Sequence, residues 1–236
     1  MTDRDVMEYD VVVVGGGPAG LAFAIRLKQL SPEASVCLLE KAAGIGAHAL
    51  SGAVIEPGPL DALAPEWRDS PPAICVPAKR DEFRFLTRQG SWRLPVPPQQ
   101  HNAGNFIVSL GLLEAWLAQK AEALGVDVFP GFAAAEAIID EAGGVAGVRI
   151  GDMGIGKDGE PGPNYAPGAD IRAKLTVLAE GCRGSVTKQL IARFGLAEGR
   201  SPQTFSLGFK ELWQLPAGRV EPGFIQHTVG WPMDSK

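Results

Sequence analysis

A glycine-rich hexapeptide near the start of the chain is the feature that most constrains its fold. Residues 15–20 read Gly-Gly-Gly-Pro-Ala-Gly and directly follow the run Val11–Val14. A continuous β-branched run is typical of a buried parallel strand. Apolar residues at helical spacing then extend from Leu21 to Leu30. A strand, a G-x-G-x-x-G turn and a helix in this order predict a dinucleotide-binding β-α-β unit.

Each glycine of this fingerprint has a mechanical role. Gly15 permits the tight turn, Gly17 lets the backbone approach a pyrophosphate, and Gly20 lets the helix pack closely on the strand. The start of the helix, at Pro18 and Ala19, presents the positive end of the helix dipole to the phosphates, with free N–H groups from Ala19 onward because proline has none.

An acidic residue stands where the second strand of this unit ends. Residues Val36–Leu39 predict that strand, and Glu40 follows it, twenty residues after Gly20. An acid at this point accepts hydrogen bonds from a ribose 2′-OH and disfavours a 2′-phosphate, which argues against NADP. NAD and FAD share the fingerprint. The alternative for Glu40 is a solvated acid after an unrelated glycine-rich turn.

A β-meander further along the chain favours FAD over NAD. Strands are expected at Ala137–Ile139, Val145–Ile150 and Ile171–Leu175, with a Gly/Pro-rich hairpin at residues 151–168. A pure NAD-binding fold would continue here with further strand–helix units.

A second strand–turn–helix also favours FAD. Thr176–Ala179 predicts a buried strand that leads to Glu180-Gly181, and a helix is expected over about residues 185–194. This stretch resembles the Gly-Asp-type motif near the flavin ribityl and pyrophosphate in the glutathione-reductase-like superfamily. Glu180 replaces the usual Asp, so the role of its carboxylate stays open.

Other segments complete the expected secondary structure. A helix is predicted from Leu110 to Leu124, with Ser109 as its N-cap and Gly125 as its stop, and Val126–Phe129 follows as a third parallel strand. Two further alternations predict strands, the second of them entering an antiparallel sheet: Phe83 with Phe85, and Phe205 with Leu207 and Phe209.

Composition excludes several classes of function. The hydrophobic fraction of 45% and charged fraction of 21% are those of a soluble globular protein. The net charge of −5 carries no basic block, so nucleic acid is not expected as a partner. The cysteines, Cys37, Cys75 and Cys182, are too widely spaced for a disulfide framework or a zinc site, and they fit a reducing compartment. The charged first ten residues resemble neither a secretory signal nor a transit peptide, and no apolar run is long enough to span a bilayer.

Several stretches resemble the electron transfer flavoprotein:ubiquinone oxidoreductase family specifically. The resemblance runs from about Tyr9 to Asp234 in the same order and with similar spacing. It is carried by residues 40–53, 124–136, 154–159, 179–182, 210–213 and 227–232.

The resemblance implies a monotopic membrane flavoenzyme. Such an enzyme takes electrons from reduced electron transfer flavoprotein through a [4Fe–4S] cluster and FAD and passes them to ubiquinone. In a bacterium it would lie on the cytoplasmic face of the inner membrane. The family chain is more than twice as long as this one, and its cluster cysteines, its last FAD segment and its quinone-contacting glycines fall beyond Lys236. We therefore expect this chain to be a truncated part that is inactive alone.

The expected fold class is α/β. It comprises an FAD-binding Rossmann-like domain of the glutathione-reductase type with a β-meander, plus the start of a second domain built on an antiparallel sheet. The FAD-binding domain is expected over residues 9–80 and 100–200, and the partial quinone domain over residues 81–99 and 201–236.

The fingerprint and the resemblance together give a set of cofactor-binding candidates. No catalytic protein residue is expected because the flavin carries the chemistry. His48, in the glycine-rich turn after Glu40, is the one candidate for a contact with the isoalloxazine or a quinone path, with a backbone-bonded turn histidine as the alternative. The cofactor-binding candidates are Gly15, Gly17, Pro18, Ala19, Gly20, Glu40, Lys41, His48, Leu50, Ser51, Gly52, Ala134, Glu180 and Gly181.

The resemblance also implies that residues 49 to about 70 dip into the membrane. This stretch combines apolar residues, prolines and a tryptophan, which suits insertion into the lipid interface rather than a span. The alternative is a covering loop packed on the sheet. The candidate membrane contacts are Leu50, Val54, Ile55, Leu60, Leu63 and Trp67.

Two other functional classes remain as alternatives. One is a related geranylgeranyl-reductase-like or hydroxylase-like flavoprotein, against which residues 154–159 and 210–213 argue. The other is a non-catalytic FAD-binding or membrane-docking module.

Overall fold

The chain forms two compact units in the computed structural model, which describes residues 4–49, 52–69 and 75–233. The first unit comprises Met1–Ala49 and Glu114–Gly208, and the second comprises Leu50–Leu113 and Phe209–Lys236. The expected domain boundaries stay a prediction; in these compact units, residues 50–80 and 100–113 group with the second unit and residues 201–208 with the first.

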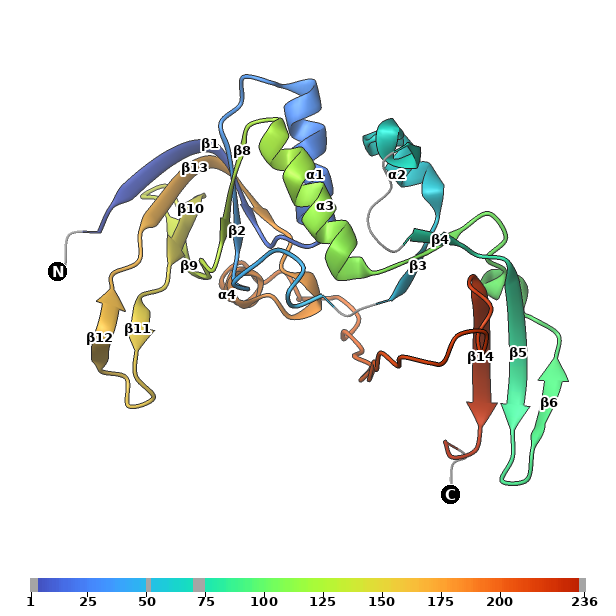
Figure 1. Ribbon diagram of the computed structural model, residues 1–236. Helices are drawn as coiled ribbons and strands as arrows, with labels where there is room; N and C mark the ends of the chain where they lie inside the picture. The colour runs from blue at the N-terminus through green and yellow to red at the C-terminus, as the bar shows by residue number, and fades with distance from the viewer. Residues whose placement is uncertain (1–3, 50–51, 70–74, 234–236) are drawn as a thin grey trace. The chain divides into compact units, whose positions relative to one another are not determined.

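A mixed six-stranded sheet forms the centre of the first unit (Figure 1). In spatial order its strands are β8 (Val126–Pro130), β2 (Val36–Glu40), β1 (Val6–Val14), β13 (Asp170–Leu178), β10 (Val145–Ile150) and β9 (Ala134–Ile139). The first four strands in this order are parallel to one another, whereas β10 pairs antiparallel with both β13 and β9.

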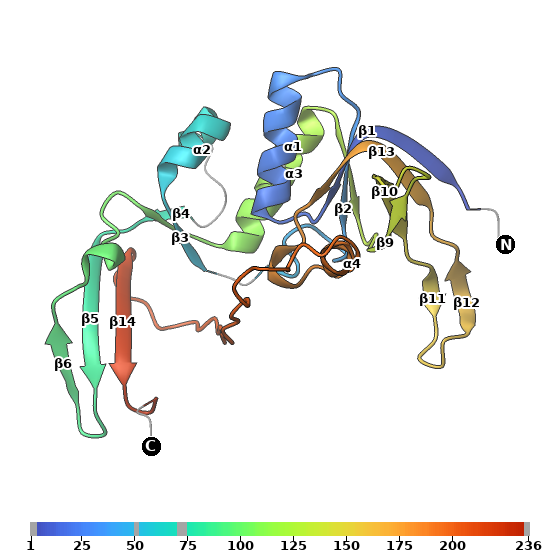
Figure 2. The same cartoon turned by 180° about the vertical axis from the view of Figure 1, so that it is seen from behind.

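Helices cover both faces of this sheet, which explains why residues 11–14 of β1 and 36–39 of β2 are apolar and buried. Helices α1 (Pro18–Leu30) and α3 (Leu110–Ala123) lie side by side in both views (Figures 1 and 2). Gly20 of α1 sits against the Val13 side chain, so Val13 faces α1. Helix α4 (Ser185–Arg193), after a 3-10 helix at Gly181–Arg183, contacts β9.

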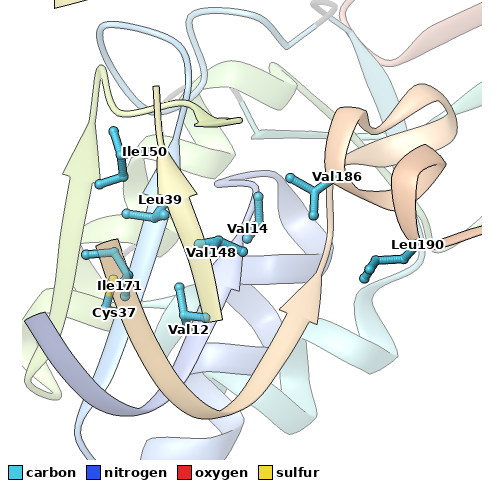
Figure 3. Close-up of a cluster of buried hydrophobic side chains, with 9 residues drawn as sticks. All are labelled: Val12, Val14, Cys37, Leu39, Val148, Ile150, Ile171, Val186 and Leu190. Carbon is cyan, nitrogen blue, oxygen red and sulfur yellow. The ribbon is translucent and has the colours of Figure 1, made fainter. Parts of the chain in front are cut away.

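The opposite sides of the same strands form a buried cluster with α4 (Figure 3). Successive side chains of a strand point to opposite faces, so Val12 and Val14 face α4 while Val13 faces α1. Each fully buried aliphatic side chain of this kind contributes about 1.5–3 kcal/mol. The cluster consists of Val12, Val14, Cys37, Leu39, Val148, Ile150, Ile171, Val186 and Leu190.

The expected Rossmann-like α/β fold is confirmed, and so are most of its elements. The glycine turn joins β1 to α1, β8 is a third parallel strand, and Gly125 ends α3 with a φ of 82°. The residues from 151 to 168 form an antiparallel hairpin of β11 (Met153–Ile155) and β12 (Pro161–Ala166).

One expectation about the meander is wrong. Residues 171–175 and 176–179 were expected as two strands, but β13 is a single strand. It pairs with β1 along its length and with β10 only over Asp170–Arg172. No turn residue separates Leu175 from Thr176, so nothing in the sequence interrupts the strand there.

The second unit contains two small sheets. In the first, β5 (Arg80–Leu86) pairs parallel with β14 (Phe224–Gly230) and antiparallel with β6 (Ser91–Leu94), which confirms a strand at Phe83 and Phe85. The second sheet has the order β3 (Ala53–Ile55), β7 (Phe106–Val108) and β4 (Cys75–Pro77). Helix α2 spans Pro57–Leu63, and 3-10 helices span Pro65–Arg68 and Pro98–Gln100.

The strand expected around residues 205–209 is absent, and that prediction is wrong. Residues 201–216 form neither helix nor strand. Phe205, Leu207 and Phe209 are 55%, 84% and 87% exposed. A strand needs a neighbour for its main-chain hydrogen bonds, and no strand among the described residues pairs with this segment.

Leu60 and Trp67, expected among the membrane contacts, are buried instead. They are 8% and 1% exposed. The Trp67 indole N–H donates to Asp61 Oδ1 at 2.6 Å, and its ring meets Phe106 edge-to-face with centroids 5.0 Å apart. The Arg68 guanidinium lies 4.9 Å from the Trp67 ring centroid. Side chains enclosed in this way have no free apolar surface for lipid, so their burial favours the covering loop.

We predict that Trp67→Ala destabilises the protein by about 3–5 kcal/mol, because it opens a cavity and leaves Asp61 without its indole donor. Trp213, which is 74% exposed, provides the matched control. Trp213→Ala should change the free energy of unfolding by less than about 1 kcal/mol. Denaturant titration of the two variants checks this, and equal losses would show that Trp67 is not a core residue.

Candidate functional site

A cleft of about 470 Å³ opens at the carboxyl ends of the parallel strands of the first unit. Ligands of open α/β sheets bind at this edge, and the volume lies in the usual range for small-molecule sites. Its walls come from the end of β1 and the glycine turn, the end of β2 and residues 41–49, residues 132–134, and residues 179–185, with Glu114 added from α3.

The glycine turn is shaped by two close backbone approaches. Gly15 has a φ of +111°, and a Cβ built on it would lie 2.3 Å from the carbonyl oxygen of Ala179. A Cβ on Gly20 would lie 2.1 Å from the carbonyl oxygen of Gly15. No side chain fits at either position, because real Cβ atoms do not approach other atoms so closely.

Gly17 differs because nothing lies within 4 Å of a Cβ built there. It lines the cleft and acts as the N-cap of α1 without any side-chain capping bond. The first N–H groups of the helix therefore have no side-chain acceptor, and together with the helix dipole they form an anion site. The packing of the protein therefore does not require glycine at this position, and the missing side chain leaves space for a ligand.

Glu40 holds the glycine turn in place from the end of β2. Its Oε2 accepts from the Gly16 N–H at 2.8 Å, and its Oε1 accepts from the Ala42 N–H at 2.7 Å. Each carboxylate oxygen can accept a further hydrogen bond. The sequence predicted a contact with a ribose hydroxyl, but it did not reveal that Glu40 also joins the turn to residues 41–49.

Glu180 caps helix α4. Its Oε1 accepts from the N–H groups of Ser185 at 2.8 Å and Val186 at 3.2 Å. Its Oε2 accepts from the N–H of Thr187 at 2.8 Å and from its hydroxyl at 2.7 Å. A carboxylate here also complements the helix dipole. Glu180 thus has a local structural role, while its predicted cofactor contact stays a prediction, and Gly181 continues the chain with a φ of +76°.

Most predicted cofactor-binding residues meet at this cleft. Gly20 lies behind it in α1, Gly52 belongs to the second unit, and Leu50 and Ser51 lie outside the described residues. His48 is exposed at its rim. The predicted residues that line the cleft are Gly15, Gly17, Pro18, Ala19, Glu40, Lys41, His48, Ala134, Glu180 and Gly181.

Sequence reasoning missed Glu114. This side chain is only 5% exposed and lines the cleft from α3. Its burial, together with the charge of Glu40, raises the pKa of the Glu114 carboxyl from 4.5 to about 7. The available signal was its position, four residues after Leu110 and three before Leu117, on the apolar face of a helix.

Arg183 was also missed. It lines the cleft beside Gly181, and its guanidinium lies 5.2 Å from the ring centroid of Phe205. With Lys41 it gives the cleft two cationic side chains. No group of three or more metal-binding side chains occurs among residues 4–49, 52–69 and 75–233.

Comparisons with protein families match two parts of the chain. A family described as NAD(P)-binding Rossmann-like domain matches residues 13–73, which include the glycine turn and Glu40. A family described as ETF-QO, ubiquinone-binding, matches residues 205–236.

Curated relatives match the chain over nearly its whole length. The mitochondrial electron transfer flavoprotein-ubiquinone oxidoreductase of Oryza sativa is 50% identical over 99% of this chain and 41% of its own length. The enzyme of that name from Pseudomonas aeruginosa is 46% identical over 99% of this chain and 44% of its own. The human mitochondrial protein is 46% identical over 98% of this chain and 39% of its own length.

The chain is a relative of the electron transfer flavoprotein-ubiquinone oxidoreductases. This confirms the family resemblance found in the sequence. The chain spans about two fifths of the length of the curated relatives it matches.

Solved structures agree on the fold. A geranylgeranyl bacteriochlorophyll reductase-like protein from Thermoplasma acidophilum matches 96% of this chain and 51% of its own, with a TM-score of 0.60 and 20% identity. A flavin-dependent monooxygenase in complex with FAD and substrate matches 80% of this chain and 32% of its own, with a TM-score of 0.56 and 20% identity. At such identities the likeness bears on the fold alone.

We predict that Glu114→Gln stabilises the protein at pH 8 but not at pH 5. The folded state raises the pKa of Glu114, so its contribution to stability is complete below about pH 4.5 and is lost as the pH rises through about 7. Glutamine does not titrate, so the stability of the variant relative to wild type should rise by about 2.5 kcal/mol from pH 5 to pH 8.

Denaturant titrations at both pH values measure this difference. Glu122 lies on the same helix and is exposed, so Glu122→Gln is the matched control and should show no such gain. If Glu114→Gln and wild type keep a constant difference from pH 5 to pH 8, Glu114 does not titrate near neutrality.

Proposed function

We propose that the complete protein is a flavin-dependent oxidoreductase that passes electrons from reduced electron transfer flavoprotein to ubiquinone. The observation that carries this proposal is an identity of 46–50% with electron transfer flavoprotein-ubiquinone oxidoreductases over 98–99% of this chain. Identity to the geranylgeranyl reductase-like structure is only 20%, so that alternative is less well supported.

FAD is the proposed cofactor of the cleft. When bound, FAD supplies the redox chemistry, while the protein binds and orients it. Three observations fit an adenine dinucleotide: the open space at Gly17, the uncapped N-terminus of α1, and an acid at the end of β2. Gly17 and the first turn of α1 would hold the pyrophosphate, and Glu40 would hold the ribose.

Backbone contacts would supply much of the remaining site. Because the Glu180 carboxylate is engaged by α4, we assign the contact at this turn to the backbone around Gly181 rather than to that side chain. Lys41, His48 and Ala134 line the cleft and complete the proposed set. The cofactor roles of Leu50, Ser51 and Gly52 stay predictions.

The proposed quinone side lies in residues 205–236. This segment matches the ubiquinone-binding family. It exposes large apolar side chains, including Phe209 at 87%, Leu212 at 91% and Trp213 at 74%. Exposed apolar side chains suit contact with a hydrophobic quinone. The ligands of the proposed [4Fe–4S] cluster would come from outside this chain.

Membrane association is proposed as peripheral and monotopic, on the cytoplasmic side in a bacterium. None of the described helices is long and apolar enough to cross a bilayer. Val54, which is 40% exposed, and the partly exposed Ile55 and Leu63 remain candidate contacts. Leu60 and Trp67 are not included because they are buried.

Gly17→Val should abolish FAD binding without disturbing the fold. A Cβ at Gly17 has no protein atom within 4 Å, but the valine side chain would occupy the proposed pyrophosphate space. Gly90→Val is the matched control, because Gly90 also has free space around a Cβ but lies in the second unit. Flavin absorbance of the purified complete protein measures occupancy, and full occupancy in Gly17→Val would refute the assigned pyrophosphate position.

Electron transfer tests the proposed function as a whole. The complete protein should reduce a short-chain ubiquinone when reduced electron transfer flavoprotein is the donor, and Gly17→Val should not. A protein that retains FAD but passes no electrons from this donor to quinone would contradict the proposal.

A further inference from the structure

Glu114 is a buried acid that no step of the proposed function uses. It is 5% exposed and lines the cleft, and burial and the charge of Glu40, with no hydrogen bond among the causes, raise the pKa of its carboxyl. Burying a carboxyl without a partner is costly, so such groups in native structures need an explanation. Its position in the wall of the cleft supplies one, because a bound ligand would provide the partner.

The neighbouring groups decide which partner suits Glu114. Both oxygens of the nearby Glu40 already accept hydrogen bonds from backbone N–H groups. Burial first, and then the charge of Glu40, raise the pKa of Glu114 to about 7, so a second carboxylate beside Glu40 is disfavoured. In its neutral form a carboxyl donates through its O–H. Ribose hydroxyls and phosphate oxygens of a dinucleotide can accept this bond.

Charged side chains on the neighbouring elements α1 and β8 bond to groups other than Glu114. On α1, Lys28 donates to the Pro32 and Ala34 carbonyl oxygens, and Arg26 donates to Gln29. Asp127 of β8 accepts from Tyr9 at 3.0 Å. On α3 itself, Lys120 and Glu122 lie more than one turn further along. The charged or titratable side chains that line the cleft with Glu114 are Glu40, Lys41, His48, Glu180 and Arg183.

We propose that Glu114 is a positioning residue of the cleft that donates a hydrogen bond from its neutral carboxyl to the bound dinucleotide. Ligand binding then takes up a proton, because the free carboxyl is partly ionised at neutral pH while the bound form must be protonated. This inference rests on the proposed dinucleotide site but is tested independently of electron transfer.

The test uses the complete protein stripped of its flavin and titrated with FAD between pH 6.5 and pH 8.5, with flavin fluorescence as the readout. Affinity of the wild type should fall on the order of tenfold over this range, because the donor form is lost above the pKa of free Glu114. Glu114→Gln keeps an N–H donor and does not titrate, so its affinity should match wild type at pH 6.5 and fall much less.

Two further variants separate hydrogen bonding from packing. Glu114→Leu fills the same buried space without a donor, so it should bind FAD about tenfold more weakly than wild type at pH 6.5. Glu122→Gln changes an exposed acid on the same helix and should follow the wild-type pH profile. Thermal melting of each variant verifies that it is folded.

Calorimetry in buffers of different ionisation enthalpy counts the protons directly. At pH 7.5 the wild type should take up a substantial fraction of one proton on binding FAD, and Glu114→Gln should take up less by that fraction. Identical pH profiles and proton counts in the two proteins would overturn the role of Glu114. Absence of FAD binding by the wild type at every pH would instead overturn the proposed cofactor site.

Discussion

Two contacts between backbone atoms determine the geometry of the cleft. Gly15 approaches the carbonyl oxygen of Ala179, and Gly20 approaches the carbonyl oxygen of Gly15. These contacts bring the ends of β1 and β13 and the start of α1 closer together than any side chain allows. The N-terminus of α1 is thereby fixed over the carboxyl ends of the strands, and Gly17 is left facing open space. A ligand is expected to bind at this edge of the sheet because the ends of β1 and β13 and the start of α1 meet there.

Acidic side chains then fix the loops around that turn. Glu40 binds the N–H groups of Gly16 and Ala42, and Glu180 binds three N–H groups at the start of α4. Both carboxylates are therefore structural parts of the cleft wall before any ligand is considered. For Glu114, burial and the charge of Glu40 raise the pKa with no hydrogen bond among the causes, and this difference separates it from the other two acids.

The sequence predicted the parts of this site that depend on local spacing. The glycine turn, the acid at the end of β2 and the neighbouring parallel strands follow from residues close together in the chain. The structure was needed wherever a distant segment decides the outcome. Alternation at Phe205, Leu207 and Phe209 predicted a strand, but no described strand pairs with it. Apolar residues near Trp67 suggested lipid contact, but Asp61 and Phe106 enclose that ring. The Glu40–Glu114 proximity joins residues 74 positions apart, and no local pattern reveals it.

The most direct test of the account is a crystal structure of the complete protein with FAD. We expect the pyrophosphate at the N-terminus of α1 beside Gly17, and a ribose hydroxyl within hydrogen-bonding distance of the Glu40 carboxylate. A structure with FAD bound elsewhere, or with the adenosine ribose turned away from Glu40, would contradict the central claim that this cleft is the cofactor site.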